Sequence, residues 1–122
     1  MDEVRIISAA DLTESVPTPG MERREAVAGP ARIIAVRTGP GLKSGWHHHA
    51  DHTTYGYIVA GRLRLESGRG GSSVVEGGPG DFFVVPPRTI HRESNPTDDE
   101  QVLIGFRFGS GEMVVNVDGP DG

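Results

Sequence analysis

Short runs of β-branched and aromatic residues, separated by glycine and proline, recur along most of the chain. The runs that predict strands are residues 32–38, 46–49, 53–66, 73–76, 81–85, 91–94, 101–108 and 113–117. None of them carries the three-to-four-residue periodicity of an amphipathic helix. Short strands with turn residues between them predict an all-β sandwich or barrel.

The first part of the chain follows this pattern less clearly, because one short apolar piece is mixed with several prolines and glycines there. We expect residues 1–30 to form an irregular N-terminal lead-in with room for one strand. Residues 31–117 are expected to form the barrel, and residues 118–122 a frayed C-terminal end. A chain of 122 residues has room for a single domain with one core.

Composition narrows the classes of function. Lysine and arginine total 12 against 17 aspartate and glutamate, so the formal net charge is -5. That balance argues against a nucleic-acid partner, which requires a basic face. No apolar run is long enough for a membrane span, and no signal-peptide pattern is present. We therefore expect a cytoplasmic protein. The chain has no cysteine, which excludes disulfides and thiolate ligands.

The candidate chemistry lies in the run His47-His48-His49. In a strand, residues i and i+2 point to the same face, with their Cα atoms roughly 6.5–7 Å apart. Two imidazoles at that spacing are able to converge on one ion at about 2.0–2.1 Å each, whereas His48 points to the opposite face. The run alone is equally consistent with a solvated loop.

Two spaced motifs add to this picture. The first runs through Gly41, His47, His49, Thr54 and Gly61, and the second through Gly80, Pro86, Arg88, His91 and Asn95. They resemble the motifs of the cupin superfamily, G-x5-H-x-H-x(3 or 4)-E-x6-G and G-x5-P-x-G-x2-H-x3-N, at eight of ten specified positions. The chain is thus similar to small single-domain cupins of the conserved-barrel type.

The resemblance implies a cupin jelly-roll β-barrel, also called a double-stranded β-helix. It implies one divalent metal ion in the lumen, held by His47, His49 and, from the second motif, His91. Iron, manganese, zinc and nickel all accept nitrogen ligands, so the ligand types do not select the metal. The resemblance further implies a homodimer that binds a small-molecule ligand or substrate.

Two positions depart from the family pattern. Thr54 stands where the ligating glutamate usually lies, which leaves three alternatives: three histidines completed by water or substrate, His52 as a fourth nitrogen ligand, or loss of the metal. Arg88 replaces a turn glycine, so we expect a negative φ or local strain there, with the side chain at the surface.

The period-two alternation of a strand places Thr54, Gly56 and Ile58 on the lumen side. Because Thr54 and Gly56 are small, we expect a roomy pocket beside the metal. Phe83 and Phe106 are expected to contribute to its wall. No general base and no serine or cysteine nucleophile is evident, so any chemistry is expected to rest on the metal.

These features favour a metal-dependent enzyme that acts on a small organic molecule. Dioxygenase-like chemistry at a three-histidine Fe(II) site is the first hypothesis, and an isomerase, cyclase or lyase that uses zinc, manganese or nickel is a variant of it. The alternative is a non-catalytic cupin that binds or senses a small molecule, because a fold alone does not establish activity.

Overall fold

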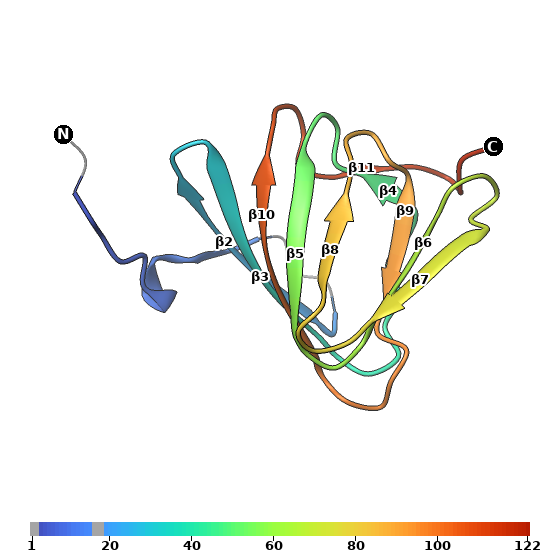
Figure 1. Cartoon of the computed structure of the whole chain (residues 1–122), viewed down its shortest axis with the longest axis horizontal. Helices are drawn as coiled ribbons and strands as arrows, with labels where there is room; N and C mark the ends of the chain where they lie inside the picture. Colours follow the sequence, from blue (N-terminus) through green and yellow to red (C-terminus); the bar gives the residue numbers. More distant parts are fainter. Residues whose placement is uncertain (1–2, 16–18) are drawn as a thin grey trace.

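A computed structural model describes residues 3–15 and 19–122. Two antiparallel β-sheets face each other and form the jelly-roll barrel that the resemblance implies, which confirms the all-β class that the strand pattern predicts (Figure 1). The larger sheet has the order β1 (Thr13–Glu14), β2 (Met21–Ala28), β3 (Ala31–Thr38), β10 (Gln101–Phe108), β5 (Thr53–Ala60) and β8 (Phe82–Val85). The smaller sheet has the order β11 (Val115–Asn116), β4 (His47–His48), β9 (His91–Ser94), β6 (Leu63–Ser67) and β7 (Ser73–Gly77).

The apolar core lies between the two sheets. Ile58 of β5 and Leu103 of β10 meet Leu63 and Leu65 of β6, and each of these side chains is at most 8% exposed. The Phe83 ring packs against this cluster from β8. Alternate residues of β5 and β10 thus point inward, as the period of a strand requires.

The N-terminal part is more regular than the sequence pattern indicated. The larger sheet includes residues before position 31, because β1 pairs with β2 and β2 pairs with β3 in an antiparallel hairpin along its whole length. A 3₁₀ turn, η1 (Ala9–Asp11), and the short strand β1 precede it. At the other end, where fraying was expected, Asp121 forms a bridge with Arg69.

Residues 53–66, expected to form one long strand, form two. The chain turns at Gly61, where φ is +79°, a conformation that L-residues with a side chain rarely adopt. A Cβ at this position would also lie 2.8 Å from the carbonyl oxygen of Glu100. Gly61, the last residue of the first motif, is therefore required by the fold and not by the site.

Asn95, the last residue of the second motif, also has a structural role. Its side chain is 1% exposed, and its Nδ2 donates to the carbonyl oxygens of Thr38, Gly39 and Asp99. Its Oδ1 accepts hydrogen bonds from the backbone and the hydroxyl of Thr97. This network closes the loop between β9 and β10 at the end of the barrel.

Within residues 3–15 and 19–122, no helix is long and apolar enough to cross a membrane.

Candidate metal centre

Three histidines from the two motifs meet inside the barrel. Strand β4 pairs with β9 so that His47 lies opposite His91, and His49 follows β4 directly. The ring centroids of His47 and His91 are 4.4 Å apart, and those of His49 lie 5.0 Å from His47 and 4.9 Å from His91. One ligand atom from each residue lies within 4.8 Å of the others. All three side chains are buried.

Each of these rings is held by a backbone carbonyl. His47 Nδ1 lies 2.9 Å from Gly45 O, His49 Nδ1 lies 2.7 Å from Met113 O, and His91 Nδ1 lies 2.9 Å from Thr89 O. A carbonyl only accepts, so each Nδ1 carries the hydrogen and each Nε2 keeps its lone pair. Metal-binding histidines are commonly fixed in this tautomer by such contacts.

The surroundings favour the neutral forms of His49 and His91. Burial, followed by the positive charge of Arg107, lowers the pKa of His49 to about 2. Burial and the neighbouring His47 likewise lower the pKa of His91. Because a histidine must be neutral to bind a metal ion, the donor set suits a divalent cation, and three imidazoles would leave the positive charge of that cation uncompensated.

The other two histidines lie outside the three-histidine cluster. His52 is buried, and its Nδ1 hydrogen-bonds with the carbonyl oxygen of His49 at 2.9 Å. His48 Nδ1 accepts a hydrogen bond from the backbone of Ala50. The structure therefore does not bring His52, the candidate fourth nitrogen, into the group of converging ligand atoms.

Thr54, at the position of the family's glutamate, is buried and faces the histidines across a cavity. Its Oγ1 accepts a hydrogen bond of 2.9 Å from Arg107 Nε. Burial lowers the pKa of Arg107 to about 10, so its guanidinium stays charged at neutral pH. A cationic arginine thus lies beside the position where the family pattern has a carboxylate.

Of the two alternatives at Arg88, a negative φ or local strain, the structure has the second, because its φ is +55°. The strain of this left-handed conformation is balanced by local contacts: its backbone N–H donates to Ala50 O at 2.7 Å. Its side chain is exposed, as expected, and pairs with Asp51 through two hydrogen bonds of 2.7 and 3.2 Å. These contacts join the segment after His49 to the loop before His91.

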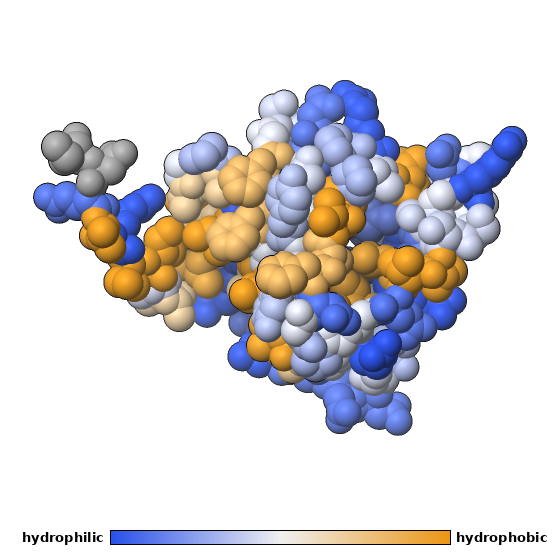
Figure 2. Space-filling model, viewed as in Figure 1, coloured by the Kyte–Doolittle hydropathy of each residue, from blue (hydrophilic) through white to orange (hydrophobic). Residues whose placement is uncertain are grey.

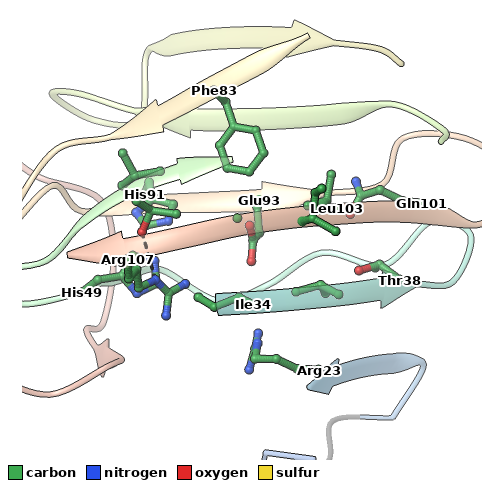
Figure 3. A pocket seen from close by; sticks show the side chains of 15 residues that line it. Arg23, Ile34, Thr38, His49, Phe83, His91, Glu93, Gln101, Leu103 and Arg107 are labelled. Atoms are coloured by element: carbon green, nitrogen blue, oxygen red, sulfur yellow. Dashed lines mark hydrogen bonds between the residues drawn. The ribbon is translucent and has the colours of Figure 1, made fainter. Parts of the chain in front are cut away.

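Two neighbouring hollows adjoin the histidines. The inner cavity, about 40 Å³, is lined by His49, His91 and Thr54 (Figure 3). The outer cleft, about 530 Å³, reaches His47. Three residues line both hollows: Arg23, Glu93 and Arg107.

The predicted pocket residues separate into different environments. Phe83 lines the inner cavity, but its ring lies over Gly56, where an added Cβ would be 2.0 Å from it. The space expected beside Gly56 is therefore filled. Ile58 is part of the apolar core. Phe106 was wrongly placed in the pocket wall: it is 46% exposed on the outer face of β10, between the inward-facing Gly105 and Arg107.

The three residues shared by the two hollows were not predicted from the sequence as pocket residues. Arg107 follows Leu103 and Gly105 on the inner face of β10, and Glu93 follows His91 on the inner face of β9. Period-two counting from a buried neighbour would have indicated both. Arg23 lies on β2, within the segment treated as a lead-in, so no such neighbour was available.

A family model described as Cupin domain matches residues 34–106. This range contains both histidine motifs and more than half of the chain. The chain belongs to the cupin family. The sequence matches no curated protein.

Solved structures share this cupin fold. KdgF from Halomonas sp. is 25% identical, with 84% of this chain and 92% of that chain covered and a TM-score of 0.67. An uncharacterised double-stranded β-helix protein from Klebsiella pneumoniae is 16% identical, with 95% and 99% covered and a TM-score of 0.72. A variant of oxalate decarboxylase OxdC from Bacillus subtilis is 19% identical, with 86% and 30% covered and a TM-score of 0.75.

Proposed function

We propose that this cupin is a metal-dependent enzyme that acts on a small organic molecule, with His47, His49 and His91 as the ligands of one divalent ion. The observation that carries the proposal is the shared orientation of the three rings. Each Nδ1 is occupied by a carbonyl, and one ligand atom of each residue lies close to the other two. The three Nε2 atoms therefore offer buried lone pairs that suit a cation.

When bound, a divalent ion with three neutral ligands supplies Lewis acidity and coordination positions for substrate oxygen groups. The chain itself has four tasks. The carbonyls of Gly45, Met113 and Thr89 orient the imidazoles, and the buried barrel wall excludes water. The outer cleft admits the substrate. Thr54 contributes no charge and holds the Arg107 guanidinium toward the cavity.

Nitrogen ligands leave iron, manganese, zinc and nickel open as the metal. We propose oxygen chemistry of the dioxygenase type with Fe(II) as the first reaction class. Isomerase, cyclase or lyase chemistry, with zinc, manganese or nickel as a Lewis acid, is the second version of the same site.

The test is reconstitution of the metal-free protein with each of the four ions, one at a time. Each form is incubated with a library of small organic acids, and turnover is followed by NMR and by an oxygen electrode. We expect at least one ion to support turnover that the His91→Ala variant lacks. Ligand binding without turnover by any reconstituted form would contradict the enzyme and favour a binding or sensing protein.

Thr54→Glu tests the missing carboxylate. The new side chain would lie between the histidines and Arg107, and a charged ligand is expected to raise metal affinity about tenfold. Because Arg107 would compete for the carboxylate, the gain should be larger when Arg107→Leu is the background. The measurement is competition for the metal with a chelating dye. Equal affinities with and without Thr54→Glu in both backgrounds would show that residue 54 does not face the ion.

We also propose that the chain forms a homodimer through the outer face of the larger sheet. Figure 2 shows hydrophobic side chains gathered over β10, β5 and β8 on this face. Its outward residues include Tyr55, Phe82, Val84, Ile104 and Phe106, each at least 42% exposed. An uncharged apolar face is complementary to a second copy of itself, as a two-fold interface requires.

A further inference from the structure

Arg107 is a buried cation that forms no ion pair with the part of the chain that the structure describes. The residue is 9% exposed, and its Nε donates to the neutral hydroxyl of Thr54. Among the residues that the structure describes, no carboxylate lies within 4.0 Å of its guanidinium, and its two Nη groups make no hydrogen bond to the protein. A buried charge is normally paired, and the two Nη groups are free to take an anionic partner from the cavity.

Further positive charge surrounds the same space. Arg23, on β2, lines both hollows, and Lys43 lines the outer cleft. The Nη2 of Arg23 has the thioether of Met21 as its partner, at 3.2 Å, which is a weak acceptor. The carboxylates on these walls are Glu25 and Glu93, so cations outnumber anions by one. A divalent ion on the histidines would raise this excess and attract an anion.

The sizes of the hollows place such a ligand. The inner cavity of about 40 Å³ holds little more than a water molecule. The outer cleft of about 530 Å³ has room for a small organic acid. Arg107 and Arg23 lie on the wall that the two share, and Figure 3 shows both along the cavity with His49 and His91. One ligand in the cleft is therefore able to reach an arginine and the histidine cluster together.

We propose that the Nη groups of Arg107, supported by Arg23, bind a carboxylate of a small organic acid. A second oxygen group of the same ligand, such as another carboxylate, a hydroxyl or an oxo group, is directed to the ion on the three histidines. This second contact rests on the proposed function, whereas the arginine contact does not. A planar guanidinium with two free Nη groups matches the two oxygens of a carboxylate.

The test uses succinate as the probe, with succinamide as its neutral counterpart and inorganic phosphate as the other anion. Binding is measured by calorimetry on zinc-loaded and on metal-free protein. We expect succinate to bind both forms, the zinc-loaded one more tightly, and both more tightly than succinamide. Arg107→Gln should weaken succinate binding about tenfold or more in both forms, with the zinc content unchanged.

Three further variants keep the result interpretable. Arg37→Gln removes an exposed arginine of β3 that pairs with Glu100. This variant should leave succinate binding unchanged. Arg107→Lys keeps the charge without the two-pronged geometry and should restore part of the affinity. If Arg107→Gln does not fold, the half-buried Arg23→Gln replaces it and should weaken succinate binding about threefold or more.

The binding measurements distinguish failure of the metal proposal from failure of the arginine site. Wild-type protein that takes up no zinc but binds succinate through Arg107 would refute the metal proposal and leave the arginine site standing. Unchanged succinate affinity in Arg107→Gln, equal binding of succinamide, tighter binding of phosphate than of succinate, or no succinate binding to either form would overturn the arginine site.

Discussion

His91→Ala is expected to lower the bound divalent metal from about one ion per chain to less than about a tenth of that, because only two protein ligands remain. His91 comes from β9 and completes a group whose other members come from β4 and the residue after it. Metal content is measured by elemental analysis after dialysis, and the fold by circular dichroism. The apolar core of Ile58, Leu63, Leu65 and Leu103 contains none of the histidines, so the barrel should persist.

The neighbouring histidines provide matched controls. His48 and His52 lie in the same segment but outside the cluster, with Nδ1 contacts to the backbone of Ala50 and His49. His48→Ala and His52→Ala should therefore retain the metal. Full metal content in His91→Ala, or loss of metal in His52→Ala alone, would contradict the proposed ligand set.

Phe106→Glu is expected to convert the proposed homodimer into a monomer. The Phe106 side chain is 46% exposed among other apolar side chains on the outer face of the larger sheet. In a two-fold interface each substitution occurs twice, so two carboxylates would be buried near each other without partners. The dimer dissociation constant should rise about a hundredfold or more, as measured by analytical ultracentrifugation over a concentration series.

Val74→Glu is the control for this variant, because Val74 is 44% exposed but lies on β7 of the smaller sheet. Val74→Glu should leave the dimer intact. Both variants should retain the metal, since Phe106 and Val74 line neither hollow beside the histidines. A wild-type monomer at high concentration, or a Phe106→Glu dimer as stable as the wild type, would overturn the proposed interface.

Strand alternation and motif spacing were sufficient to predict the fold class and to predict that three histidines come together. Counting by two from His47 placed His49 on the same face and set His48 aside, and this agrees with the cluster in the structure. The family spacing supplied His91, which no local pattern links to His47. The partnership across β4 and β9 depends on sheet pairing, which alternation within one strand does not determine.

The composition of the pocket was less predictable. In β10 the usual rule is inverted at one end, because Arg107 is buried and Phe106 is exposed. A rule that turns phenylalanine inward and arginine outward therefore misplaced Phe106. Likewise, Gly56 faces inward as expected, but a side chain from another strand, Phe83, occupies the space above it. Such filling depends on tertiary packing.

The N-terminal strand was hard to recognise for a related reason. The sequence of β2, MERREAVA, has charged residues on both faces, which is atypical of a buried strand. In the structure its inward charges, Arg23 and Glu25, line the cleft and do not enter the core. The inward positions of β2 are thus polar because they line the cleft.

The metal content of the wild-type protein, purified without an affinity tag and in the absence of chelators, tests the central claim most directly. Elemental analysis should find about one divalent transition-metal ion per chain, removable by chelation and restored by one equivalent of a suitable ion. Protein that contains no metal as purified and takes up none of iron, manganese, zinc or nickel would contradict the proposed metal centre.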